Sequence, residues 1–389
     1  MQIKLFIYII LFVTVLFSDW EIVNYPDNFG IQNISTENNG IYVSTFSGFY
    51  SSFDDGENWS ILPENSDIIT YYGLDLFEKI GDYLFLSQNI LSEDIYNYRI
   101  YYNGDHWENW EIIPYQNSAL LELIYDNDKI YAILDQGIAY SLDFGLSWTY
   151  MLNPPNDGYI NLLFASDGDL YVNHGCQIYR TQNMGEVWED VTGEIINIGP
   201  PDPYECTSIM GMVKTNNDLI ISVYWYGGVG TLFYSEAQNI SWNFIDNFPS
   251  NHNSGYYYNS VSSMNFKNNI LYLGTATSSD GIFYTDNLLD FYDYSEGLES
   301  YDLSVSKLIS SANFLYKQGG TTNTFQIELI PSFYENGDIN QDGTINIQDI
   351  ITLINYILNS DFNTEGDLNN DQEINVLDVI YLVSIILNR

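Results

Sequence analysis

The chain of 389 residues is long enough for more than one domain, and its 52 acidic residues against 10 basic ones give a formal net charge of −42. This charge excludes nucleic acid and anionic membrane surfaces as partners, because few basic side chains are available to neutralise phosphates. It favours solubility and the binding of cations.

The first 18 residues predict a secretory signal peptide. Lys4 supplies the positive flank, and Leu5–Phe17 form an apolar core shorter than a membrane span. Cleavage is expected near Ser18, although no Ala-x-Ala site is present; the alternative is an uncleaved anchor. No later apolar run approaches the length of a membrane span. We therefore expect a mature chain without such a span, located outside the cell or on its surface.

The segment Ser51–Leu62, SSFDDGENWSIL, predicts a strand, a tight turn and a second strand. Its skeleton is a small hydroxyl at Ser52, a carboxylate at Asp54, glycine at Gly56 and an aromatic ring at Trp59. The carboxylate can accept hydrogen bonds from backbone N–H groups in the turn, and glycine supplies a residue with positive φ. The indole is expected to cover the apolar edge where the next strand starts.

This skeleton recurs along the chain. A recurrence of roughly 40 to 50 residues is the period of a four-stranded propeller blade. One full and one conservative copy are Ser141, Asp143, Gly145 and Trp148, and Thr181, Asn183, Gly185 and Trp188. Weaker copies are Asn103, Asp105 and Trp110; Ser235 and Trp242; and Thr285, Asn287 and Tyr292.

Two independent patterns give the number of blades. Apolar strands that follow a short polar turn occur seven times, at Ile41–Ser44, Tyr83–Ser87, Ile130–Leu134, Leu170–Asn173, Leu219–Val223, Ile270–Gly274 and Phe314–Lys317, and we interpret them as inner strands. Outer strands opened by an aromatic residue occur only six times after the signal, at Trp59, Trp110, Trp148, Trp188, Trp242 and Tyr292. We expect the segment near Trp20 to complete the blade begun by Leu315–Leu329. Such closure removes free sheet edges.

The repeated residues resemble the Asp-box, or BNR, repeat of sialidase-like and sortilin-like propellers. The resemblance implies a seven-bladed β-propeller and says nothing specific about activity. In that family the repeat lies on a turn between the two outer strands, away from the central channel. It therefore implies a structural role for these Asp and Trp residues.

The strand order assigns the connections to two faces. Turns at Thr36, Asp126, Ser166 and Thr215 join first to second strands, and the opposite face carries the variable connections 88–98, 192–204, 224–230 and 248–259. Two of these connections hold candidate sugar-binding aromatic residues, which are Tyr224, Trp225, Tyr226, Tyr256, Tyr257 and Tyr258, with Asn251, His252 and Asn253 as hydrogen-bonding neighbours. In a chain with 35 tyrosines, ordinary surface residues are the alternative.

The sequence assigns no catalytic residue. Sialidases of the resembling family hold their substrate with three arginines, and after the signal this chain has only Arg99, Arg180 and Arg389, so sialidase activity is not expected. Asp-box xyloglucanases use two acidic residues between tandem propellers, and one ring is expected here. A carboxylate pair for glycoside hydrolysis stays open but cannot be selected among so many acids. The histidines, His106, His174 and His252, lack metal-ligand spacing, and Cys176 and Cys206 are either a disulfide between neighbouring blades or two free thiols.

After Pro331 a different pattern begins, with two copies of a calcium loop that each open an apolar helix. Oxygen ligands fall at positions 1, 3, 5, 7, 9 and 12, the seventh through a backbone carbonyl. In the first copy they are Asp338, Asn340, Asp342, Thr344, Asn346 and Asp349, and in the second Asp367, Asn369, Asp371, Glu373, Asn375 and Asp378. The following helices are expected near Ile347–Leu358 and Val376–Leu387.

This duplicated pattern resembles a type I dockerin, with Asp at position 12 and one helix after each loop. The resemblance implies two Ca²⁺ ions, folding coupled to metal binding, and docking onto a cohesin module of a scaffold protein. Ile347, Gln348, Val376 and Leu377 occupy the positions where many dockerins carry Ser or Thr for cohesin recognition. Gln372 replaces the usual loop glycine, which favours a weaker second site.

The sequence thus predicts a mainly β protein: a signal peptide at 1–18, a seven-bladed propeller at 19–330 closed by strands from both ends, a linker at 331–336, and a small all-α, EF-hand-like dockerin at 337–389. The leading interpretation is a scaffold-attached protein whose propeller binds polysaccharide or protein. A glycoside hydrolase and a structural cell-surface protein, whose C-terminal module packs on its own propeller, are the alternatives.

Overall fold

The computed structural model describes residues 19–24, 30–37, 39–63, 74, 76–90, 94–102, 106–108, 110–113, 120–134, 137–155, 160–174, 177–193, 195, 208–216, 218–225, 229–237, 239–249, 261–276, 281–319, 321–330, 337, 339–340, 345–359, 366, 368 and 374–387. The expected signal peptide and both cysteines lie outside these residues. All statements below concern the described part of the chain.

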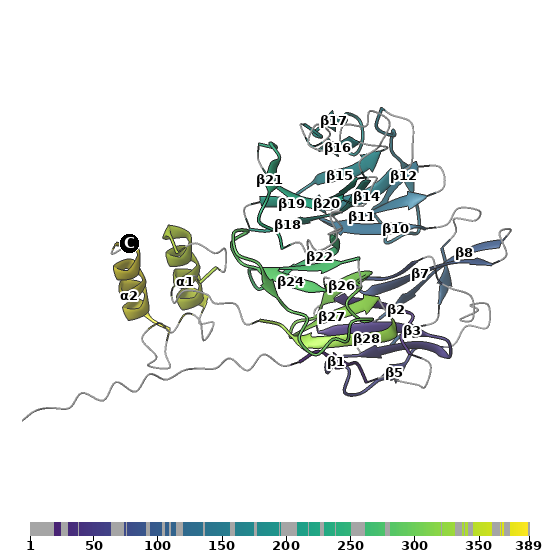
Figure 1. Ribbon diagram of the computed structural model, residues 1–389, viewed down its shortest axis with the longest axis horizontal. Coiled ribbons are helices and arrows are strands. Elements are labelled where there is room, and N and C mark those ends of the chain that lie inside the picture. The colour runs from purple at the N-terminus through teal and green to yellow at the C-terminus, as the bar shows by residue number, and fades with distance from the viewer. Residues whose placement is uncertain are drawn as a thin grey trace, which may run out of the picture.

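The described strands form seven four-stranded antiparallel sheets, which are the blades of a β-propeller (Figure 1). Blade 1 contains β2 (Asn33–Glu37), β3 (Gly40–Thr45), β4 (Gly48–Ser52) and β5 (Ser60–Ile61); blade 2 contains β6 (Leu76–Ile80), β7 (Tyr83–Ile90), β8 (Asp94–Tyr101) and β9 (Glu111–Ile112). Blade 3 contains β10 (Glu122–Asp126), β11 (Lys129–Leu134), β12 (Gly137–Ser141) and β13 (Thr149–Tyr150); blade 4 contains β14 (Ile160–Ser166), β15 (Asp169–His174), β16 (Gln177–Thr181) and β17 (Glu189–Asp190).

The remaining blades repeat this order. Blade 5 contains β18 (Ser208–Lys214), β19 (Asp218–Trp225), β20 (Val229–Glu236) and β21 (Asn243–Ile245), and blade 6 contains β22 (Val261–Lys267), β23 (Ile270–Thr275), β24 (Ile282–Thr285) and β25 (Tyr292–Asp293). Blade 7 contains β26 (Lys307–Ser310), β27 (Phe314–Gly319), β28 (Thr321–Glu328) and, from the other end of the chain, β1 (Glu21–Ile22). The closure expected near Trp20 is therefore confirmed.

The first strand of each blade contacts the first strand of the next, from β2 through β26 and back to β2. The apolar runs interpreted as inner strands are the second strands of the blades, β3, β7, β11, β15, β19, β23 and β27, as the turns that precede them predict. These strands are apolar along their length because neighbouring blades cover both of their faces. Every residue of β3 and β23 is buried.

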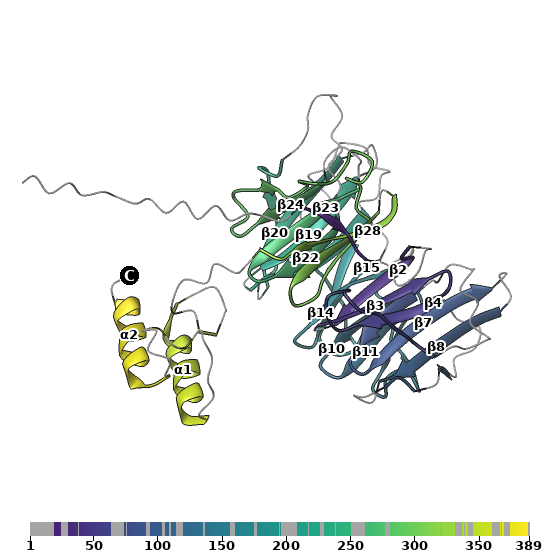
Figure 2. The ribbon, with the colours of Figure 1, turned by 90° about the horizontal axis from the view of Figure 1, so that it is seen from below.

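The hydrophobic core is divided among the gaps between blades. Tyr42, Phe49 and Leu62 of blade 1 pack with Leu84 and Tyr98 of blade 2, and similar clusters fill the other gaps. Figure 2 shows blades 1 and 2 as neighbouring sheets through β2–β4 and β7–β8. Each blade is therefore stabilised mainly by its neighbours.

The repeated turn has the geometry that its residues predict. In blade 3, Ser141 Oγ donates to Asp143 Oδ1 at 2.8 Å and accepts from the Gly145 backbone N–H at 2.8 Å, while Asp143 Oδ1 also accepts from the Ser147 N–H at 2.8 Å. Phe144 and Gly145 both have positive φ, 52° and 85°. A Cβ on Gly145 would lie 3.1 Å from the Phe85 ring, so glycine serves both conformation and packing.

The indoles of the repeat link neighbouring blades. Trp110 Nε1 donates to the Pro63 carbonyl at 2.9 Å, Trp188 Nε1 to Leu152 at 2.7 Å, and Trp242 Nε1 to Val191 at 2.8 Å. Each acceptor follows the fourth strand of the preceding blade. Trp148 differs, because its Nε1 donates to Gly145 in its own turn.

We expect Asp143→Ala to lower the free energy of unfolding by about 1 kcal/mol at pH 7, since backbone N–H groups in the turn lose their acceptor. Burial raises the pKa of Asp143, but hydrogen bonds from Ser147, Ser141 and Leu146 outweigh it, and the pKa lies below its ordinary value. Because the folded pKa is the lower one, this contribution is present above the unfolded pKa of about 3.9 and is lost as pH falls through the folded pKa.

The measurement is urea unfolding followed by tryptophan fluorescence at pH 7 and pH 3. Asn183→Ala is the matched control, because Asn183 Oδ1 accepts from the Val187 N–H in the same turn of blade 4 without titrating. Asn183→Ala should lower the free energy of unfolding by the same amount at both pH values. Equal costs at both pH values for Asp143→Ala would contradict the prediction.

Candidate metal centre

Helices α1 (Ile347–Asn359) and α2 (Val376–Leu387) begin with the same capping arrangement. Asn346 Oδ1 accepts from the Gln348 N–H at 2.7 Å, and Asp349 Oδ2 accepts in return from the Asn346 N–H at 2.8 Å. Asn375 and Asp378 repeat this pair at 2.8 and 2.9 Å. Such a reciprocal capping box fixes where each helix starts.

The second oxygen of each aspartate binds the start of its own loop. Asp349 Oδ1 accepts from the Asn340 N–H at 3.0 Å, and Asp378 Oδ1 accepts from the Leu368 N–H at 2.9 Å. Both aspartates are 0% exposed. Position 12 of each loop therefore draws the loop back onto the helix and holds a carboxylate inside it.

The structure brings together the predicted ligands that it describes. Asn340, Asn346 and Asp349 meet in the first loop, and Asn375 and Asp378 meet in the second. Asp338, Asp342, Thr344, Asp367, Asn369, Asp371 and Glu373 lie outside the described residues. Within the described residues, no three His, Cys, Asp or Glu side chains form a metal-binding group, so the candidate sites depend on the Asn oxygens and on those further ligands.

The donors fit a hard cation. The predicted ligand set consists of carboxylate, amide and carbonyl oxygens, which Ca²⁺ prefers. Residues 337–389 contain nine acidic residues and one basic residue, Arg389, so no lysine or arginine within the segment can neutralise both buried carboxylates. Backbone N–H groups offset part of the cost of burying them, and a bound cation would offset the rest.

The two helices share a small core of their own. Ile339, Ile345 and Leu353 of the first half pack with Leu368 and Leu382 of the second. Leu353 and Leu382 follow Asp349 and Asp378 by one helical turn and are 0% exposed. The same inward positions are used in both halves, so the duplicated sequence gives two equivalent helices.

Each helix also presents apolar side chains to solvent. On α1 these are Ile347, Ile351, Ile354 and Leu358, and on α2 they are Val376, Leu377, Ile380 and Tyr381, all between 39% and 75% exposed. The predicted recognition residues Ile347, Gln348, Val376 and Leu377 are all exposed. The other five exposed apolar residues were not predicted from the sequence, although the spacing of 347, 351, 354 and 358 is that of one face of a helix.

Two of the aromatic residues predicted to bind sugar are among the described residues, and both lie in a strand instead of the expected loop. Tyr224 and Trp225 belong to β19 rather than to a loop, because the ladder continues through Tyr224↔Gly230 and Trp225↔Val229. The expected connection 88–98 is likewise mostly strand, with pairing up to Ile90↔Asp94. Tyr226, Tyr256, Tyr257 and Tyr258 lie outside the described residues.

Other residues singled out in the sequence have structural partners. Arg99 Nη2 lies 3.0 Å from Glu111, and Arg180 Nη2 lies 2.6 Å from Asp169. His174 is buried, with Nδ1 at 3.1 Å from the Pro154 carbonyl, and His106 lines a cavity between blades 1 and 2. None of the described helices is long and apolar enough to cross a membrane.

These observations define the class of protein as a seven-bladed β-propeller that carries a duplicated loop–helix module with oxygen ligands. Residues 336–387 match the dockerin type I domain, and this segment is therefore a dockerin type I domain. Domains of this type bind calcium. No curated protein matches the chain.

Solved structures support the propeller fold alone, because all identities are low. The extracellular domain of a proposed one component system from B. thetaiotaomicron is 12% identical with a TM-score of 0.56, and the match covers 81% of this chain but only 40% of that domain. Virginiamycin B lyase from Staphylococcus aureus is 13% identical with a TM-score of 0.55, with 80% and 99% of the two chains covered. The WD40 propeller domain of Doa1 is 9% identical with a TM-score of 0.51, and the match covers 81% of this chain and 98% of that domain.

Proposed function

We propose that this chain is an exported protein whose dockerin docks onto a cohesin module, so that a scaffold carries the propeller and the propeller binds polysaccharide or protein. In this proposal residues 1–18 are the signal peptide, 19–330 the propeller, 331–336 a linker and 337–389 the dockerin. The observation that carries it is the match of 336–387 to a dockerin, together with its buried Asp349 and Asp378. The propeller repeats belong, in the same proposal, to the Asp-box type.

The proposal includes two calcium sites. Asp338, Asn340, Asp342, Thr344, Asn346 and Asp349 would hold one ion, and Asp367, Asn369, Asp371, Glu373, Asn375 and Asp378 the other. Calcium would supply the positive charge that allows these carboxylates to gather. The chain's own contribution is orientation, because the capping boxes of Asn346–Asp349 and Asn375–Asp378 fix each helix relative to its loop.

The exposed apolar residues of α1 and α2 are the proposed cohesin-docking surface. Exposed apolar side chains on a helix face are the usual anchors of a helical interface. Because the two halves are duplicates, Ile347 and Val376 occupy equivalent positions after their N-caps. Either helix can then act as the anchor.

We expect Ile347→Asp with Val376→Asp in one chain to weaken docking at least about 100-fold, since a charge would be buried in the interface whichever helix is used. Each single substitution should weaken docking much less. The measurement is biolayer interferometry of the full chain with calcium on immobilised cohesin modules from the source organism. Leu289→Asp on the propeller, where Leu289 is 72% exposed, is the control. Undiminished docking by the double variant would contradict the prediction.

Glycoside hydrolysis is a second candidate, favoured by one cavity between blades 4 and 5. This cavity has a volume of about 710 Å³ and contains Asp218 and Glu236, which pair across β19 and β20. Burial, and secondarily the charge of Glu236, raise the pKa of Asp218 above its ordinary value. A carboxyl with a raised pKa beside a second carboxylate is the pattern of a general acid. Release of reducing sugar by the purified full chain is the assay that decides between the two candidates.

A further inference from the structure

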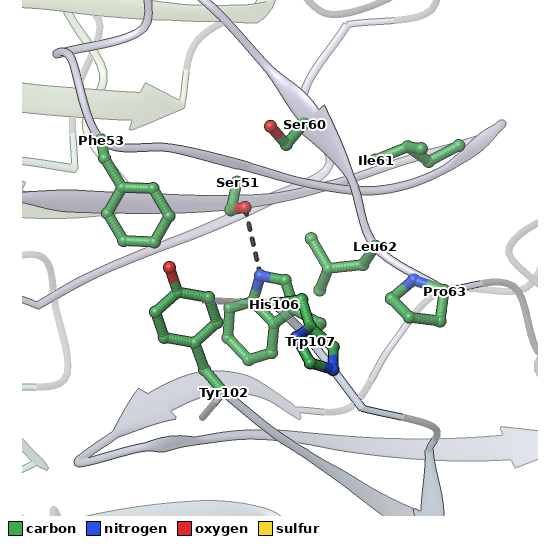
Figure 3. A pocket seen from close by; sticks show the side chains of 9 residues that line it. All are labelled: Ser51, Phe53, Ser60, Ile61, Leu62, Pro63, Tyr102, His106 and Trp107. Atoms are coloured by element: carbon green, nitrogen blue, oxygen red, sulfur yellow. Dashed lines mark hydrogen bonds between the residues drawn. The ribbon is translucent and has the colours of Figure 1, made fainter. Parts of the chain in front are cut away.

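A cavity of about 520 Å³ opens between the outer halves of blades 1 and 2 (Figure 3). Its buried floor consists of Ser51, Leu62 and Trp107, and Phe53 and Tyr102 form one wall. Ser60 and His106 are exposed at its mouth. The volume lies in the range of about 300–1,000 Å³ that is typical of small-molecule sites.

Beside this cavity, blade 2 differs from blades 1, 3 and 4. In blades 1, 3 and 4 the third strand leads into a compact turn closed by a Ser or Thr hydroxyl. In blade 2 the chain instead forms an isolated bridge between Tyr102 and Trp107, and Trp107 Nε1 donates to Ser51 Oγ of blade 1 at 3.3 Å. The additional indole thereby fills the gap beside blade 1. A departure from an otherwise regular pattern is where function is expected.

The aromatic wall is held in place before any ligand arrives. The rings of Phe53 and Tyr102 stack with centroids 5.5 Å apart and an interplanar angle of 26°. The Trp107 ring centroid lies 5.0 Å from that of Tyr102 and 5.7 Å from that of Tyr42, which it contacts edge-on. Phe53 nevertheless remains 49% exposed. A rigid, partly exposed aromatic surface binds without the cost of ordering its side chains.

The polar groups of the cavity are neutral or weakly basic. Among the described residues that line it, none carries a carboxylate, ammonium or guanidinium group, although the chain as a whole carries a charge of −42. Hydroxyls of Ser60 and Tyr102 and the imidazole of His106 can both donate and accept hydrogen bonds. This combination suits a ligand with an apolar C–H face and several hydroxyls, and the described part of the lining offers a charged ligand no ion pair.

We propose that the pocket formed by Phe53, Tyr102 and Trp107 binds one sugar ring of a neutral polysaccharide. The inference rests on the proposed function and deepens it, because it names the substrate class and places the site at the outer edge of the ring. One face of the sugar packs against the exposed part of the Phe53 ring, which Tyr102 supports from its other side, and the sugar hydroxyls bond to the polar groups at the mouth. The rest of the polysaccharide extends past the rim into solvent.

The test is isothermal titration of the full chain with hexasaccharides of glucose, xylose and mannose, and with hexagalacturonic acid as the charged probe. At least one neutral hexasaccharide should bind, and hexagalacturonic acid should bind at least about tenfold more weakly. Phe53→Ala should weaken neutral binding about tenfold or more, and Ser60→Trp, which fills the cavity from its exposed mouth, should abolish it.

Leu142→Ala is the matched control, because Leu142 holds the same position of the repeat in blade 3 and is 63% exposed without lining this cavity. It should bind like the wild type. Neutral binding that survives both pocket substitutions, an absence of neutral binding, or preference for hexagalacturonic acid would overturn the inference. Cohesin docking measured on the same samples separates these outcomes from a failure of the proposed function. Urea unfolding followed by tryptophan fluorescence, which reports on the propeller, shows whether the propeller of each variant is folded.

Discussion

Chelation of calcium from the full-length protein should unfold α1 and α2 while the propeller stays folded. The buried carboxylates of Asp349 and Asp378 lie in a segment whose only basic residue is Arg389, so without the cation the backbone N–H groups offset only part of their desolvation. All eight tryptophans lie between residues 20 and 242, so tryptophan fluorescence reports on the propeller alone. Helical ellipticity at 222 nm should fall on addition of EDTA, with unchanged tryptophan emission.

Substitution at position 12 should separate the two proposed calcium sites. Asp349→Asn or Asp378→Asn removes a charged ligand and also one of the two oxygens that accept backbone N–H groups. We expect a loss on the order of 100-fold in calcium affinity at the altered site. Calorimetric titration of each full-length variant should then show about one tight ion fewer than the wild type.

Asp286→Asn provides the control for this series, since Asp286 is an exposed aspartate of the propeller. Its calcium titration should match that of the wild type. An ellipticity that EDTA leaves unchanged, or equal stoichiometry in all variants, would show that the buried aspartates act only as helix caps.

Replacement of Trp20 by alanine should lower the free energy of unfolding of the propeller by about 3–5 kcal/mol. Trp20 is 4% exposed, and its Nε1 donates to the Tyr294 carbonyl at 2.5 Å. It joins the core between blades 6 and 7, which includes Tyr272 and Leu315. Its loss would also loosen β1 from β28 and expose the edge of blade 7, where strands of other molecules can pair.

Urea unfolding and light scattering on heating measure both effects. Trp20→Phe keeps a buried aromatic ring but loses the hydrogen bond to Tyr294. The loss of this hydrogen bond should lower the free energy of unfolding by about 1 kcal/mol. Ile22→Ala in β1 is the control, because Ile22 is 52% exposed and its loss should cost little. A Trp20→Ala protein as stable as Ile22→Ala would mean that ring closure contributes little.

The sequence was sufficient for the parts of this protein that depend on local residue order. The Ser–Asp–Gly–Trp spacing predicted the turns, and the apolar runs that precede them predicted seven blades, because a strand covered on both faces must be apolar along its length. The calcium-loop spacing and the apolar runs after it predicted both helices. The structure begins them at Ile347 and Val376, where the capping pairs Asn346–Asp349 and Asn375–Asp378 are contacts over three residues.

The tertiary structure decided the features that arise between segments distant in sequence. The first strand of each blade contacts the first strand of the next, which is a relation between segments far apart in the sequence. Tyr224 and Trp225 extend a hairpin, since the ladder continues wherever both strands can pair. The pocket of Phe53, Tyr102 and Trp107 lies between two blades, and no sequence motif indicated that these three residues lie together. Local order therefore fixed each blade and each loop, while the packing between blades determined which surfaces stay open for a ligand.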